Sequence, residues 1–151
     1  MKVLANQNVM DYQTYVTETA ISKKQGSIFQ YPFINSEFHF SEMTLDPKNI
    51  FVNGDNFNLD ILIDMVKKLK PYKITHLRIE GQIYYKTIFQ SDNKVILVDG
   101  QLTSGYSGHG PSDFAKVLYE IGFDDDTLER YIFTRTGDEC IETTFILPDN
   151  V

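Results

Sequence analysis

The feature that most constrains the fold is an alternation of apolar and polar residues in the middle of the chain. The odd positions hold the apolar side chains Leu77, Ile79, Ile83, Tyr85 and Phe89. The even positions hold mostly polar or charged ones, such as His76 and Arg78, which is typical of strands with one buried face. Because a single strand usually spans about 3–10 residues, we expect a break at Gly81. A three-residue turn or a Gly bulge there would keep Ile79 and Ile83 on one buried face.

Two apolar stripes with helical spacing flank this alternation. The first runs from Asn58, a suitable N-cap, to Pro71 and contains Leu59, Leu62, Ile63, Val66 and Leu69. The second ends at Gly122, a helix stop residue, and contains Phe114, Val117, Leu118 and Ile121. Both patterns predict amphipathic helices. A further short helix is expected within residues 124–133, where three aspartates suit the first turn.

The remaining strands are expected over residues 26–34, 37–43, 94–100 and 139–147. Asn35 and Ser36 would form the turn between the first two. Pro32 favours an edge position for its strand because proline cannot donate to a central ladder. In the last strand, Cys140 faces one side of the sheet and Ile141, Thr143 and Phe145 face the other.

The order of these elements predicts the α+β class, with one mostly antiparallel sheet and two or three helices packed on one face. We expect residues 26–151 to form a single α+β domain, since 151 residues is close to the commonest domain size. Residues 1–25 are weakly patterned and are expected to form a loose or short-helical N-terminal arm.

Composition narrows the range of partners. The chain carries 21 acidic and 14 basic residues, a net charge of -7, so we expect no nucleic acid and favour a protein with a basic surface. The single cysteine, Cys140, excludes an intrachain disulfide and a Cys-based zinc site. We find neither a signal-like N-terminus nor a run of about 18 apolar residues. A cytoplasmic location with no membrane partner, no metal and no other cofactor is therefore expected.

The stretch "GYSGHGPS", residues 105–112, resembles two nucleotide-binding patterns but matches neither. It spells G-x-x-x-x-G, yet Pro111 stands where a P-loop places its lysine, which removes a cation and a backbone donor. The glycines also run as G-x-x-G-x-G, the reverse of the dinucleotide fingerprint. We therefore exclude both the P-loop and the dinucleotide interpretations.

Two interpretations of this stretch stay open. In the first, it binds a small anion or a nucleotide base. Pro111 would be the first helical residue, the amides of Ser112 and Asp113 would point outward, Tyr106 would stack and His109 would supply a proton. In the second, the glycines only let the chain turn into a helix, and the Asp113 carboxylate would in any case compete with an anion. The candidate ligand-binding residues are Gly105, Tyr106, Ser107, Gly108, His109, Gly110, Ser112 and Asp113.

No motif assigns catalytic residues. A G-x-S-x-G elbow is absent, and no two of the three histidines have metal-ligand spacing. We therefore expect a binding protein without catalytic activity that acts through a protein partner, as an inhibitor, immunity or accessory protein. The alternatives are a small-ligand binder using Gly105–Asp113 and an enzyme with His109 as acid or base. A homodimer through a strand edge near Pro32 is also possible.

Overall fold

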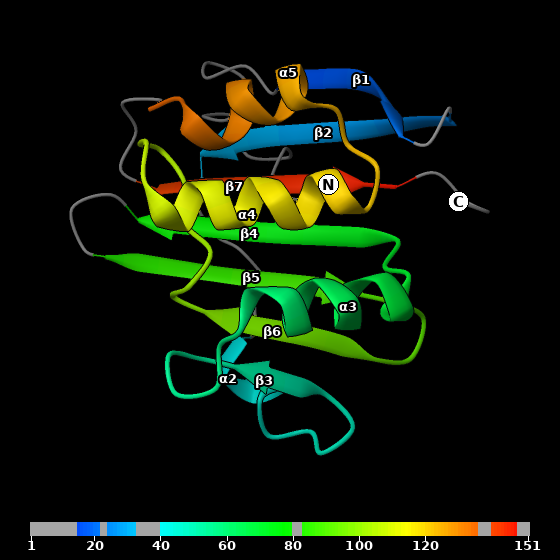
Figure 1. Cartoon of the computed structure of the whole chain (residues 1–151), viewed down its shortest axis with the longest axis vertical. Coiled ribbons are helices and arrows are strands. Elements are labelled where there is room, and N and C mark those ends of the chain that lie inside the picture. The colour runs from blue at the N-terminus through cyan, green and yellow to red at the C-terminus, as the bar shows by residue number, and fades with distance from the viewer. Residues whose placement is uncertain (1–14, 22–23, 33–39, 80–82, 136–139, 148–151) are drawn as a thin grey trace.

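A computed structural model describes residues 15–21, 24–32, 40–79, 83–135 and 140–147 of the chain. These residues build one sheet with helices packed against it, which confirms the α+β class (Figure 1). Within the described part of the chain, no helix has the length and apolar character needed to cross a membrane.

Within the described residues, the sheet has seven strands in the order β1-β2-β7-β4-β5-β6-β3. All neighbours pair antiparallel except β3 and β6, which are parallel. The sheet is therefore mostly antiparallel, as the sequence predicted. The strands are β1 (Tyr15–Ile21), β2 (Lys24–Pro32), β3 (Ile50–Val52), β4 (Lys73–Ile79), β5 (Tyr84–Gln90), β6 (Val95–Asp99) and β7 (Cys140–Ile146).

Most of the helical residues cover one face of the sheet. On this face lie α3 (Leu59–Leu69), α4 (His109–Glu120), α5 (Asp125–Leu128) and the π-helix η2 (Glu129–Phe133). Figure 1 shows α4 in front of β7 and β4, and α3 in front of β5 and β6. The short α2 (Phe40–Met43) instead packs Phe40 and Met43 against Ile88 and Leu97 on the opposite face.

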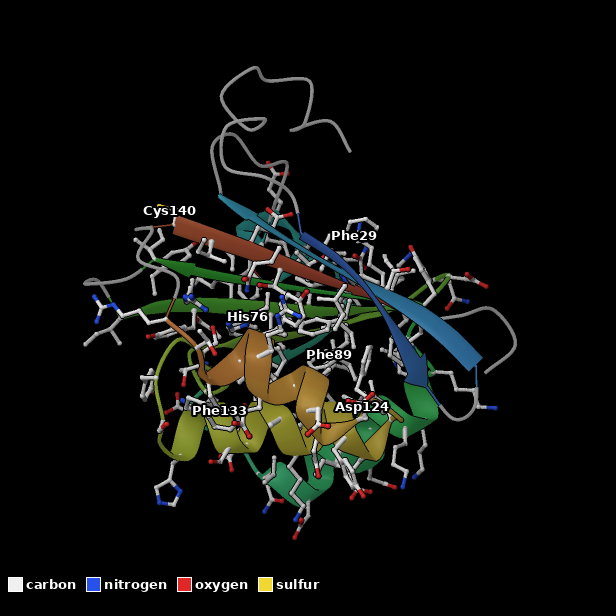
Figure 2. All side chains as sticks on the ribbon, turned by 90° about the horizontal axis from the view of Figure 1, so that it is seen from above. Phe29, His76, Phe89, Asp124, Phe133 and Cys140 are labelled. Atoms are coloured by element: carbon white, nitrogen blue, oxygen red, sulfur yellow. The ribbon has the colours of Figure 1, made fainter. Side chains whose placement is uncertain are left out.

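The main core lies between the sheet and the helix layer. The sheet contributes side chains such as Ile74, Phe89, Ile96 and Phe145, and the helices contribute Leu62, Val66, Phe114 and Leu118, all fully buried or nearly so. Figure 2 shows Phe89 and His76 between the sheet and the helices. Burying this apolar surface is the dominant force that fixes α3 and α4 on the sheet.

The ends of α3 match their predicted signals. Asn58 caps the helix, because its Oδ1 accepts the Ile61 N–H at 3.0 Å. The helix ends at Lys70, whose left-handed backbone (φ 55°) lets its N–H donate to the Val66 carbonyl, one residue before Pro71. Left-handed backbone is unfavourable for a residue with a Cβ.

The N-terminal part of the fold differs from the expected pattern. Where we expected a loose or short-helical arm over residues 1–25, residues 15–21 form β1, paired with β2 from Tyr15↔Gln30 to Ile21↔Lys24. Residues 1–14 and 22–23 lie outside the described residues. The expected edge position for the strand that contains Pro32 was wrong, because β2 lies between β1 and β7 in the sheet.

One other local prediction was wrong, and one strand was missed. Residues 40–43 form α2 and not a strand, because Phe40 and Met43, three positions apart, pack together on the apolar surface of the sheet. The expected turn at Asn35–Ser36 lies outside the described residues. The edge strand β3 (Ile50–Val52) was not predicted, since three residues are too few to show an alternation.

The expected break between the two strands is confirmed, because β4 ends at Ile79 and β5 begins at Tyr84, but the predicted length of the connection was wrong, with a consequence for the core. Ile79 pairs with Tyr84 and not with Ile83, so four residues separate the strands. This spacing puts the even residues of β4 on the same face as the odd residues of β5. His76 and Arg78, expected on the polar face, therefore share the helix-covered face with Phe89.

Candidate functional site

One end of the sheet brings together three segments that are distant in sequence. Here β4 and β6 end and β5 and β7 begin, and α4 starts beside them (Figures 1 and 2, left). We call this region the loop end and define it by Ile83–Tyr85, by residues 103–109 and by Ile132–Phe133. The Gly100 N–H donates to the Tyr85 carbonyl at 2.9 Å, which ties the chain after β6 to β5.

Three consecutive residues at the start of the loop are each held by a different partner. The Thr103 hydroxyl lies 2.7 Å from the Tyr106 hydroxyl within the loop itself. Ser104 Oγ lies 2.8 Å from His76 Nε2 of β4. The Gly105 N–H donates to the Ile132 carbonyl of η2 at 2.7 Å. The backbone of the loop is thus fixed at its root before the exposed residues 106–109 begin.

Below this root lies a buried polar network on the helix-covered face. His76 Nδ1 lies 2.8 Å from Thr87 Oγ1, and Arg78 Nη1 donates to Ser104 Oγ at 3.0 Å. His76 is 2% exposed, and its ring packs 4.5 Å from the Phe114 ring between centroids. Burial, followed by the nearby Arg78 charge, lowers the pKa of His76 from 6.5 to about 3. His76 is therefore neutral at physiological pH.

The structure explains the conformations of two loop glycines. Gly105 has φ +90°, a left-handed value that glycine adopts without strain. A Cβ at Gly110 would overlap Thr103 Oγ1, so a side chain there would push the first turn of α4 away from the loop. Both glycines are accounted for by the turn and by close packing.

The start of α4 differs from the predicted one. The helix begins at His109, so Pro111 is its third residue and not its first. The Ser112 N–H donates to the Gly108 carbonyl at 3.0 Å and does not point outward toward a ligand. Asp113 consequently lies beyond the first turn, which holds no acidic residue. The expected anion contact through the Ser112 amide is therefore wrong.

The candidate residues differ in accessibility. Tyr106, Ser107, Gly108, His109 and Ser112 are exposed, Gly110 and Asp113 are half-buried, and Gly105 is buried. Among the described residues, the His109 side chain makes no hydrogen bond or ion pair. Tyr106 is 44% exposed and projects its ring edge toward Gly108, 3.0 Å from where a Cβ would stand. Residues 106–109 thus form an accessible, aromatic and polar segment.

Ile83 is the most unusual residue of this end. It is 92% exposed and has φ 45°, which is left-handed backbone that a β-branched residue rarely adopts. Neither property helps folding, because the side chain buries almost nothing and the backbone is strained. Strained residues of this kind cluster at functional sites. The π-helix η2, whose Ile132 carbonyl accepts the Gly105 N–H, is a second feature that recurs at such sites.

Sequence reasoning missed Ile83, His76, Arg78 and Ser104. Ile83 was placed on a buried strand face, and nothing in the sequence marks its left-handed backbone. His76 and Arg78 were placed on the polar face because the length of the turn after β4 was misjudged. Ser104 adjoins the predicted stretch, and its only signal is a hydroxyl directly before Gly105.

The chemistry that this geometry allows is limited. The Ser104–His76 contact resembles a nucleophile and base, but Ser104 is 2% exposed, so its hydroxyl is sealed from a substrate. No group of three or more metal-ligating side chains occurs within the part of the chain that the structure describes. The exposed residues of the loop end, Ile83 and residues 106–109, instead form a surface that another molecule can contact.

The chain was compared with known proteins at the levels of family, sequence and structure. We found no match among protein family models, curated proteins or solved structures. The geometry of the loop end is therefore the only basis for a functional proposal.

Proposed function

We propose that the protein is a binding protein without catalytic activity and that it contacts a protein partner through the loop end. The observation that carries this proposal is Ile83, an almost fully exposed β-branched residue held in left-handed backbone. An apolar side chain that is kept exposed in spite of backbone strain is best explained by a contact in a complex.

Two other exposed residues of the loop end support a protein contact. Tyr106 is the exposed aromatic residue of the loop, and tyrosine is enriched among the residues that dominate binding energy in interfaces. His109 adds a polar group that can pair across an interface. Together these residues combine an apolar anchor with adaptable polar contacts, which is the usual anatomy of a protein interface.

The net charge of -7 favours a basic partner, since opposite charges speed diffusional encounter. An inhibitor, immunity or accessory role fits a small acidic binding protein. We place this role in the cytoplasm, where reducing conditions keep a lone cysteine such as Cys140 as a thiol.

The proposal is tested by photo-crosslinking in the cells from which the sequence comes. A photoreactive amino acid replaces Ser107, which is exposed in the loop, or Ile61, which is exposed on α3. We expect a discrete crosslinked protein from position 107 and none of that size from position 61. Equal products from both positions, or none from 107, would contradict the proposal.

A matched pair of variants sharpens this test. Ile83→Gly and Lys70→Gly each relieve left-handed backbone, but only Ile83 lies at the loop end. We expect Ile83→Gly to reduce the crosslink yield from position 107 at least tenfold, because it removes the apolar anchor. Lys70→Gly should leave the yield unchanged. A similar yield from both variants would argue against a role for Ile83 in the contact.

A further inference from the structure

We propose that Ser104 is a positioning residue that fixes the shape in which the loop end meets its partner. This inference rests on the proposed function, because it concerns how the same surface is prepared for binding. Ser104 itself is 2% exposed and touches no partner. It would act through the exposed residues that directly follow it.

The first support is the convergence of hydrogen bonds on one hydroxyl. Ser104 Oγ is contacted by His76 Nε2 at 2.8 Å and by Arg78 Nη1 at 3.0 Å. Both side chains come from the central strand β4, and Arg78 is 0% exposed. Hydrogen bonds to a buried charged group are stronger than those between neutral groups. The hydroxyl is therefore held by two buried side chains of the central strand of the sheet.

The second support is the position of this anchor in the chain. One residue later, the Gly105 N–H is held by the Ile132 carbonyl, and the next four residues are exposed. Exposed loops without an anchor sample many conformations, and ordering them opposes binding. Fixing Ser104 and Gly105 restricts the conformations of the residues that follow and so lowers that opposing entropy before the partner arrives.

The network also contains a control residue, Thr87, whose substitution shows how far the loss of any buried hydroxyl destabilises the protein. His76 Nδ1 contacts Thr87 Oγ1 at 2.8 Å, the same distance as its contact with Ser104. Thr87 is as deeply buried as Ser104 but belongs to β5 and not to the loop. Thr87→Val and Ser104→Ala thus each remove a buried hydroxyl from the same histidine, and only the second removes the anchor of the loop.

The test measures backbone order by ¹⁵N NMR relaxation on the free protein. In the wild type, residues 105–109 should have order parameters of about 0.85, as in rigid backbone. We expect both variants to lower the melting temperature, because each leaves a buried polar group with fewer partners. Only Ser104→Ala should lower the order parameters of residues 105–109 below about 0.6.

Two results would overturn the inference: residues 105–109 that stay rigid in Ser104→Ala, and an equal loss of order in both variants. If Ser104→Ala does not fold, Ser104→Cys provides the measurement, since its slightly larger thiol keeps a polar group at the same position but hydrogen-bonds weakly. There too, the order parameters must fall below those of Thr87→Val. Since no partner is present, a failed crosslink would refute the proposed function without changing this result, and a rigid Ser104→Ala loop would refute the positioning role alone.

Discussion

Lowering the pH from 6.5 toward 3 is expected to destabilise the protein through His76. Its pKa is lowered to about 3 in the folded state, whereas an unfolded histidine titrates near 6.5. Between these values the unfolded state binds a proton that the folded state excludes, so the stability present above pH 6.5 is lost as the pH falls. The loss approaches about 1.4 kcal/mol per pH unit and amounts to roughly 5 kcal/mol in total.

The physical reason is that burial deprives a charged His76 of hydration, and no group in the network compensates for this loss. His76 is buried beside the Arg78 guanidinium, which would repel an imidazolium, and it packs against the Phe114 ring. A loss of stability of this size is a large share of the 5–15 kcal/mol by which domains are usually stable. Urea denaturation at pH 7, 6, 5 and 4.5 measures the free energy of unfolding and therefore this loss.

Other groups titrate in the same range, so the control is His76→Gln. This variant should be less stable than the wild type at pH 7, since it disturbs the network, but its stability should fall less steeply between pH 6 and 4.5. Subtracting the two slopes isolates His76, because the remaining acids and histidines are common to both proteins. Parallel slopes would mean that His76 does not exclude a proton in the folded state.

Gly110→Ala is expected to destabilise the protein by about 1–3 kcal/mol. On helix propensity alone, alanine should be the better residue within α4 by about 1 kcal/mol. Steric overlap reverses the sign, because the new methyl group would collide with Thr103 Oγ1. Thr103 is buried and its hydroxyl is engaged with Tyr106, so neither it nor the helix can move away freely. Thermal denaturation should show a melting temperature several degrees lower.

Two further variants test whether steric overlap with Thr103 causes the destabilisation by Gly110→Ala. Thr103→Ala combined with Gly110→Ala should recover part of the lost stability, because the colliding hydroxyl is gone. Gly108→Ala, at an extended backbone position beside the flexible Tyr106 ring, should lose no more than about 0.5 kcal/mol. If Gly110→Ala is as stable as the wild type, the close approach of α4 to Thr103 is not what holds the loop.

The sequence was sufficient for elements whose signals are local. The stripe and caps of α3 depend on residues within a few turns of each other, and Asn58 and Pro71 bound the helix as expected. The faces of β7 also follow directly from its alternation, because Ile141, Thr143 and Phe145 pair with Arg78, His76 and Ile74 on the helix-covered face. Strand order and the parallel pairing of β3 with β6 depend on contacts between distant residues and leave no local signal.

The site was predictable only in part, for the same reason. The glycines marked the loop, but not the residues that hold it. A four-residue connection between β4 and β5, in place of three, puts the even residues of β4 on the helix-covered face with Phe89. That single difference turned His76 and Arg78 from expected surface residues into the buried anchor of Ser104. The exposure and left-handed backbone of Ile83 arise in the same connection.

The most direct test of the central claim, that Ile83 is kept for contact and not for folding, is the melting temperature of Ile83→Gly. Glycine adopts left-handed backbone without strain, and a side chain that is 92% exposed contributes almost no burial. The account predicts a gain of about 0.5–1 kcal/mol, seen as a melting temperature roughly 1–4 °C above the wild type. A lower melting temperature would show that Ile83 supports the fold and would contradict the claim.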